Sequence, residues 1–121
     1  MGPDAETSSE PKKRRKPGTS PTQRTLAELR KRGYLAAVVE RWNAYAKIRQ
    51  DLWGLIDVIG VRDNETIAIQ TTSGDHVAER VQKIADSDKA PILRRAGWSI
   101  VVWGWRKDKT GHWVLREVDC S

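Results

Sequence analysis

The stretch DLWGLIDVIGVRDNETIAIQTTSG, residues 51–74, decides the fold, because it holds two apolar runs with a polar turn between them. Branched aliphatic residues dominate Leu55–Val61 and Thr66–Thr72, which predicts two β-strands. The intervening RDNE is typical of a tight turn, so the strands are expected to pair as a hairpin. The hairpin would place Asp57 and Gln70 near the same end of neighbouring strands.

The residues on either side of this hairpin indicate further helices and strands. In chain order we expect a helix over 22–33, a strand over 34–42, an irregular or extended connection over 43–50, a helix over 73–97 that Pro91 interrupts, and strands over 98–105 and 112–118. The resulting order, α-β-β-β-α-β-β, predicts a mixed α/β domain with one central sheet flanked by helices.

Length and charge restrict the class of protein. A chain of 121 residues favours one domain, and 22 Lys and Arg against 16 Asp and Glu give a net charge of +6. This excess suits a polyanionic partner, with nucleic acid first and an acidic membrane surface second, although a merely soluble basic protein has the same property. The single cysteine, Cys120, excludes an internal disulfide and a Cys-rich zinc site, which fits a reducing compartment. The sequence has neither an apolar run long enough to span a bilayer nor an apolar signal core.

Residues 1–23 are predicted to be a disordered basic tail, and the folded domain is expected to occupy residues 22–121. The tail contains the run PKKRRK, whose five consecutive cations are Lys12, Lys13, Arg14, Arg15 and Lys16. Such a run can bind phosphates without sequence preference, and it also resembles a short nuclear-import signal. A solvated tail without a specific role is the third possibility.

The hairpin end suggests metal-assisted chemistry on a phosphodiester. An acid at the end of one strand and an oxygen-bearing side chain at the end of the next can converge on one hard divalent cation, Mg²⁺ or Mn²⁺. The backbone carbonyl of the intervening residue, Thr71, would add a further oxygen ligand. A bound cation of this kind can polarise water and stabilise charge beside a scissile phosphate.

The segments GLIDVIGV and IAIQTTSG, in this setting of helix, strand and hairpin, resemble the PD-(D/E)XK nuclease superfamily. Archaeal-type Holliday-junction resolvases and related phage endonucleases are the most similar groups. The resemblance implies a restriction-endonuclease-like core with a four-stranded mixed sheet flanked by helices. It also implies that Asp57 and Gln70 occupy the two metal-binding positions, and that Thr72 occupies the position of the lysine that activates water.

Two of these positions depart from the family motif in residue type. Gln70 offers a neutral amide oxygen in place of a carboxylate, and Thr72 can neither carry charge nor act as a base near neutral pH. Other side chains can compensate. The missing carboxylate could come from Asp51, Glu40 or Glu28, the missing positive charge from Lys47, Arg49, Arg80 or Lys83, and a base or phosphate ligand from His76.

Tryptophan is the main large aromatic residue, with six copies and no phenylalanine. Trp103 and Trp105 alternate on one predicted strand, and with Trp98 and Trp113 they are expected to form one face of the sheet, as core or as a dimer interface. A platform for unstacked bases is the alternative. Trp53 lies beside the proposed site and could insert at a DNA junction.

The sequence therefore favours a metal-dependent DNA endonuclease of the resolvase-like type with attenuated activity. We expect DNA, branched or duplex, as its partner, a homodimer as its assembly, no membrane association, and the cytoplasm of a bacterial or phage-infected cell as its location. The import-like run would instead favour the nucleus. A catalytically silent nucleic-acid-binding module on the same fold, and a protein–protein adaptor, are the alternatives.

Overall fold

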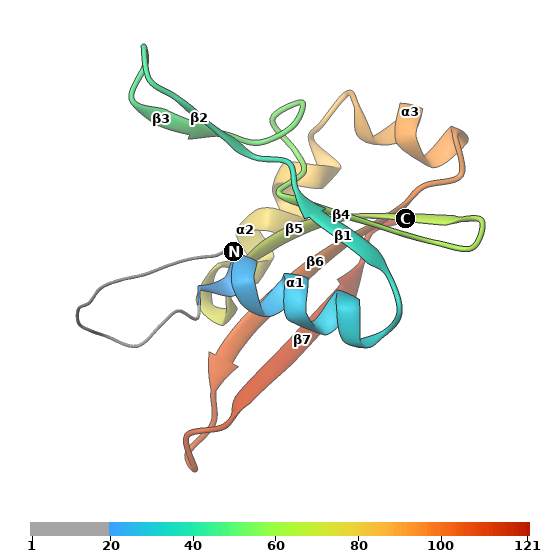
Figure 1. The fold of residues 1–121 in the computed structure, drawn as a ribbon. Coiled ribbons are helices and arrows are strands. Elements are labelled where there is room, and N and C mark those ends of the chain that lie inside the picture. Colours follow the sequence, from blue (N-terminus) through green and yellow to red (C-terminus); the bar gives the residue numbers. More distant parts are fainter. Residues whose placement is uncertain (1–19) are drawn as a thin grey trace, which may run out of the picture.

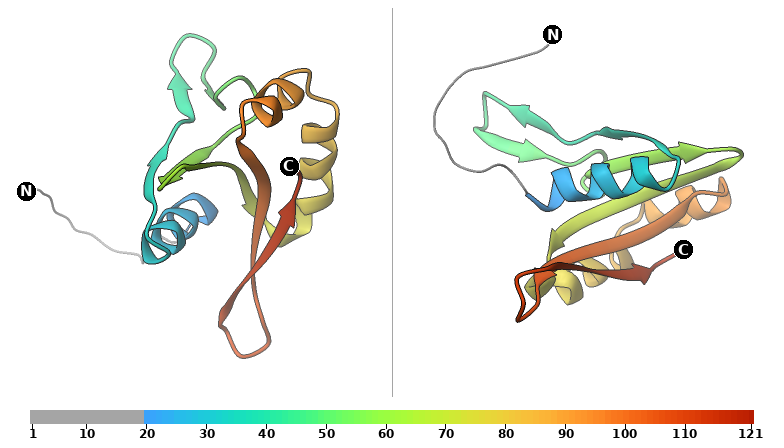
Figure 2. Two further views of the ribbon diagram at one scale, coloured as in Figure 1. Left: turned by 90° about the vertical axis from the view of Figure 1, so that its right-hand side faces the viewer. Right: turned by 60° about the horizontal axis from the view of Figure 1, so that its bottom comes forward.

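The computed structural model describes residues 20–121, which form a mixed five-stranded sheet with helices on both faces (Figures 1 and 2). The elements in chain order are α1 (Pro21–Lys31), β1 (Leu35–Val38), β2 (Arg41–Asn43), β3 (Ile48–Gln50), β4 (Val58–Arg62), β5 (Glu65–Ser73), the 3₁₀-helix η1 (Gly74–His76), α2 (Val77–Ala85), α3 (Ala90–Arg95), β6 (Ser99–Lys107) and β7 (Trp113–Asp119). The strand order is β1-β4-β5-β6-β7, with only β5 and β6 parallel. The predicted mixed α/β class is confirmed, and the main sheet has five strands where the resemblance implied four.

The β4–β5 hairpin lies in the middle of the chain and sets the position of the acid, as predicted. Val58 pairs with Ile69, and the backbone N–H of Asp57 donates to the Ile69 carbonyl at 3.0 Å. Asp57 therefore stands beside Gln70 at the end of the antiparallel pair.

The strand β4 begins at Val58, three residues later than predicted. The preceding residues form a tight turn in which the Leu52 N–H donates to the Ile56 carbonyl at 2.9 Å. Trp53 and Gly54 have left-handed φ angles of 55° and 67° in this turn. Leu55 and Ile56 are buried as predicted for apolar residues, but they pack from a turn and not from a strand.

The core has two layers, one on each face of the sheet. Leu26 and Leu29 of α1 pack with Ile69 and Trp103 on one face, whereas α2 and α3 cover the other face. Side chains alternate along a strand, so Ile69 and Thr71 face α1. The intervening Gln70, followed by Thr72, faces α2.

The first helix begins slightly earlier than the sequence indicates. Ser20 caps α1 by accepting the backbone N–H of Gln23 at 3.2 Å, so Pro21–Gln23 belong to the helix and not to the predicted tail. Gly33 ends the turn after the helix with a φ of 92°, as expected for a C-terminal stop. The basic run Lys12–Lys16 lies outside the described residues.

The predicted strand 34–42 is divided into two, and the predicted connection 43–50 is partly strand. β1 pairs with β4 until Val38, and the Val39 N–H still donates to the Asp57 carbonyl at 2.8 Å. The chain then leaves the main sheet, and β2 and β3 pair with each other as a separate hairpin that projects from the body of the molecule (Figures 1 and 2). The sequence lacks a strong Gly or Pro turn signal here, which is why the hairpin was not predicted.

The predicted helix over 73–97 is interrupted before Pro91. α2 ends at Ala85, and α3 begins at Ala90 with Pro91 in its first turn, where proline is well tolerated. Gly97 follows α3 with a φ of 87°, as predicted for a helix stop. Among residues 20–121 no helix has the length and apolar character that crossing a membrane requires.

The tryptophans do not share one face of the sheet, contrary to the prediction. Trp103 and Trp105 are buried in the α1 layer, which confirms the core interpretation for these two residues. Trp98 packs against the opposite layer, with its ring centroid 6.1 Å from that of Trp53. Trp113 is partly exposed beneath the guanidinium of Arg24.

Close contact between β6 and α2 fixes the helix that carries the cationic side of the candidate site. A Cβ atom at Gly104 would lie 2.3 Å from Cγ2 of Val77, which requires the Val77 side chain or the helix to move. Gly104→Ala is therefore expected to lower the free energy of unfolding, measured by urea denaturation, by about 1–3 kcal/mol. In the double variant with Val77→Ala, the cost should be smaller than the sum of the two single costs; a strictly additive result would contradict this contact.

Candidate functional site

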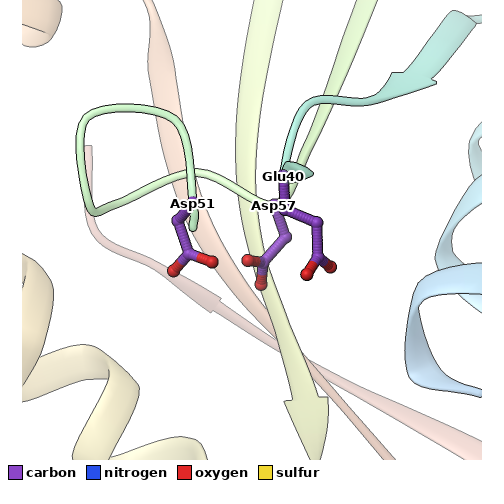
Figure 3. A group of neighbouring side chains, drawn as sticks. All are labelled: Glu40, Asp51 and Asp57. Atoms are coloured by element: carbon purple, nitrogen blue, oxygen red, sulfur yellow. The ribbon is translucent and has the colours of Figure 1, made fainter. Parts of the chain in front are cut away.

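Three carboxylates converge beside β5, at the end where β4 begins. Glu40, Asp51 and Asp57 each offer an oxygen, and these oxygens lie within 4.8 Å of one another (Figure 3). The side chains come from three separate segments and point toward the same space beside β5. Asp57 is buried, whereas Glu40 and Asp51 are partly exposed.

The local fold brings these three residues together from separate positions in the chain. Glu40 lies where the chain leaves β1 for the β2–β3 hairpin, and Asp51 follows directly after β3. Asp57 precedes β4, which pairs with β1. The projecting hairpin therefore returns the chain to its starting point and sets Asp51 beside Glu40.

The position of Asp57 is fixed by the backbone of β5. Its Oδ2 accepts the N–H of Thr71 at 2.9 Å. Burial and the neighbouring Asp51 carboxylate raise the pKa of Asp57 to about 7, although the Thr71 N–H acts in the opposite direction. Asp57 thus carries a proton more often than an ordinary aspartate.

Asp51 is held in the charged form by its neighbours. Burial acts to raise its pKa, but hydrogen bonds with Asp57 and Lys83 outweigh burial and leave the pKa of Asp51 below its usual value. Lys83 Nζ lies 2.9 Å from Asp51 Oδ2 and reaches it from α2. The site therefore contains a lysine beside a carboxylate. In the PD-(D/E)XK motif the lysine lies on the strand, at the position of Thr72, whereas Lys83 belongs to α2.

The raised pKa of Asp57 predicts that stability depends on pH when divalent cations are chelated. Asp57 binds its proton more tightly in the folded chain than in the unfolded chain, where the usual value is 3.8. The free energy of unfolding should therefore fall, by roughly 2–4 kcal/mol, as the pH rises from about 4 to about 7. Urea denaturation in EDTA across this range should show the slope in the wild type and a flatter profile in Asp57→Asn. Equal slopes would refute a perturbed Asp57.

Gln70 lies beside the carboxylates but does not direct its oxygen toward them. Its side-chain Nε2 donates to the Leu55 carbonyl and, at 3.4 Å, to Asp51 Oδ2. Its Oε1 accepts from Arg80 of α2. These partners determine the orientation of the amide, since the opposite orientation would set oxygen against oxygen. Gln70 therefore acts here as a buried bridge between Asp51 and Arg80, and its oxygen faces Arg80. The carboxylates near Asp57 are those of Glu40 and Asp51.

The residues present suit a hard divalent cation. Oxygens that share an Mg²⁺ ion lie about 3–4 Å apart, given metal–oxygen distances of about 2.0–2.1 Å. The three carboxylates would need only small side-chain movements to reach that spacing. Because the N–H and C=O of a strand residue point to the same edge, the Thr71 carbonyl also faces the side of Asp57. Carboxylate and carbonyl oxygens together favour Mg²⁺ or Mn²⁺ over softer metals.

A groove of about 870 Å³ opens beside the acidic cluster. Its lining includes Asp51 itself, the cations Arg41, Arg49 and Lys83, and the ring of Trp53. Arg49 also lies 4.0 Å from Glu40, at the edge of the cluster. The groove thus combines a cationic wall with an acidic end, an arrangement that suits a phosphate-bearing ligand held against a metal ion.

Four other predicted site residues, Thr72, His76, Glu28 and Lys47, are not part of the acidic cluster. Thr72 is buried on the α2 face, further along β5 than Gln70. His76 is exposed and pairs with Glu79 at 3.3 Å. Glu28 of α1 pairs with Arg32 at 2.8 Å and does not belong to the cluster of Glu40, Asp51 and Asp57. Lys47 is exposed in the turn between β2 and β3, which extends away from the sheet.

Trp42 and Tyr45 are candidate functional residues that sequence reasoning missed. Both lie in the β2–β3 hairpin and are exposed. The available signal was the regular mixture of aromatic and basic residues in RWNAYAKIRQ, residues 41–50, which contains no acid.

Comparison of the chain with protein-family models, with curated proteins and with solved structures finds no match.

Proposed function

We propose that this protein is a metal-dependent endonuclease that hydrolyses phosphodiester bonds in DNA, of the resolvase-like type within the PD-(D/E)XK superfamily. The observation that carries the proposal is the convergence of Glu40, Asp51 and Asp57, of which Asp51 also lines a cationic groove. A Mg²⁺ or Mn²⁺ ion bound there would act as a Lewis acid on a phosphoryl oxygen and on water. Cutting both strands of a junction requires two such sites, so the proposal includes a homodimer.

The protein residues have separate roles in this proposal. Glu40, Asp51 and Asp57 hold the cation, and the raised pKa of Asp57 means that this residue gives up a proton when a cation binds. Lys83, in contact with Asp51, supplies the positive charge that Thr72 lacks. Arg41 and Arg49 orient a phosphate along the groove.

A catalytically silent nucleic-acid-binding module is the second candidate. It is favoured by Gln70, whose amide nitrogen, not its oxygen, faces Asp51. It is also favoured by the direct ion pair between Lys83 and Asp51, which neutralises part of the acidic charge without a metal. The cationic groove and the hairpin would then bind DNA without cutting it.

The test is cleavage of end-labelled four-way junction, flap and duplex DNA in Mn²⁺, compared with EDTA and with the variant Asp51→Asn. We expect the wild type to nick DNA in Mn²⁺ and not in EDTA. Nicking should be strongly reduced in Asp51→Asn, and this reduction would exclude a contaminating nuclease as the source of the activity. DNA binding without cleavage in any metal would support the silent module. Absence of both binding and cleavage would reject both candidates.

A further inference from the structure

The β2–β3 hairpin, residues 41–50, projects from the body of the domain (Figures 1 and 2). Glu40 precedes its first strand and Asp51 follows its second, so both ends of the hairpin are attached to candidate metal-binding residues. Anything that orders or moves this hairpin therefore acts on two of the three carboxylates.

The hairpin exposes large apolar side chains. Trp42 is 57% exposed, Ile48 is 51% exposed and Tyr45 is 99% exposed. The turn itself is well defined, since Asn43 Oδ1 accepts the backbone N–H groups of Tyr45 and Ala46, both at 3.0 Å. An ordered turn that presents an aromatic ring to solvent favours a binding role over a packing role.

Charge indicates the kind of partner. Within residues 41–50 the cations are Arg41, Lys47 and Arg49, and there is no acidic residue. Trp42 pairs across the strands with Arg49, so these two side chains share one face of the hairpin. Two copies of the hairpin would repel each other through these cations, which argues against a self-association surface. A polyanion whose flat rings can stack on aromatic side chains matches both features.

We propose that the hairpin binds unpaired nucleotides of a branched or frayed nucleic acid, with Trp42 and Tyr45 stacking on bases while Arg41 and Lys47 contact phosphates. This inference rests on the proposed function and specifies its substrate class. Bases in a continuous duplex are already stacked and expose only their edges, whereas unpaired bases offer a free face to an aromatic ring. The groove between the hairpin and the acids, with Trp53 on its wall, would then direct the adjoining strand to the metal site.

The test is fluorescence anisotropy with a labelled fork that has single-stranded arms and with a blunt duplex of the same length, both in EDTA. The double variant Trp42→Ala/Tyr45→Ala should bind the fork at least about tenfold more weakly, with a smaller change for the duplex. Leu35→Ala, which removes an exposed apolar side chain from β1, is the matched control and should bind both as the wild type does. Fork affinity that is equal in the double variant and the wild type would overturn the inference.

A second measurement addresses the phosphates. The slope of log affinity for the fork against log salt is negative, and it should become less steep by about 0.7 in Lys47→Ala, which removes one phosphate interaction of the hairpin. Lys47 does not line the groove, and the slope should not change in the exposed control Lys109→Ala. Because both measurements use EDTA, they do not depend on cleavage.

If the hairpin variants bound DNA normally while the wild type still cleaved in Mn²⁺, the hairpin inference would fail and the proposed function would stand. A third outcome is that sedimentation detects a dimer of the wild type but not of the hairpin variants, while the variants keep their DNA affinity. The hairpin would then be an interface between copies, which would also overturn the inference.

Discussion

Asp57→Asn is expected to lower the proposed Mn²⁺-dependent DNA cleavage by at least about 100-fold, because it removes one of the three carboxylates that we propose to hold the cation. The same variant is expected to be more stable than the wild type at pH 8. Asp57 is buried beside Asp51, so its ionised form is unfavourable, and asparagine has the same shape without the charge. Its side-chain oxygen can still accept the Thr71 N–H, so the backbone contact is retained.

Cleavage rates and urea denaturation in EDTA at pH 8 would test both parts of this prediction. Asp75→Asn is a suitable control, because Asp75 lies outside the acidic cluster, in the short helix η1. The control should affect neither cleavage nor stability to a comparable degree. A variant Asp57→Asn that cleaves normally would reject the site, and one that loses both activity and stability would indicate a structural role for Asp57.

Gln70→Glu is expected to destabilise the protein by about 2–4 kcal/mol when divalent cations are chelated. The wild-type amide donates to the Leu55 carbonyl and to Asp51, and a carboxylate at this position would direct an oxygen toward two acceptors. Arg80 offsets only part of that cost, since it already contacts the other end of the side chain. A divalent cation would offset more of it, because a fourth carboxylate would then be available to bind the ion.

Thermal unfolding with and without Mn²⁺ would measure this effect. The increase in Tm caused by Mn²⁺ should be larger in Gln70→Glu than in the wild type. The exposed change Gln50→Glu, in β3, serves as the control for added charge. An equal Mn²⁺ shift in Gln70→Glu and the wild type would mean that Gln70 does not adjoin a metal site.

Local patterns in the sequence predicted much of the fold. Alternating and continuous apolar runs identified β4, β5, β6 and β7, and the turn residues between β4 and β5 predicted their hairpin. That hairpin placed Asp57 beside Gln70, as the structure confirms. These features depend on neighbouring residues, whose side-chain spacing and turn chemistry are visible in one dimension.

The sequence was less informative where distant segments meet. It proposed Asp51 and Glu40 as candidate acids, but only the return of the β2–β3 hairpin places them beside Asp57. It proposed an oxygen from Gln70, whereas the Leu55 carbonyl and Arg80 orient that amide the other way. Side-chain orientation in a buried cluster follows from which donors and acceptors the other segments contribute.

The amino-acid sequence by itself determined the two apolar strands, the helices on either side of them, the basic character of the chain and the acid at the start of β4. Only the tertiary structure decided which carboxylates form a cluster, which lysine faces them and which aromatic rings remain exposed. The physical reason is that strand and helix formation depend on interactions between residues near in sequence. A metal-binding geometry instead depends on charges carried by three separate segments, whose approach is fixed by the register of β1 on β4 and by the packing of α2 on the sheet.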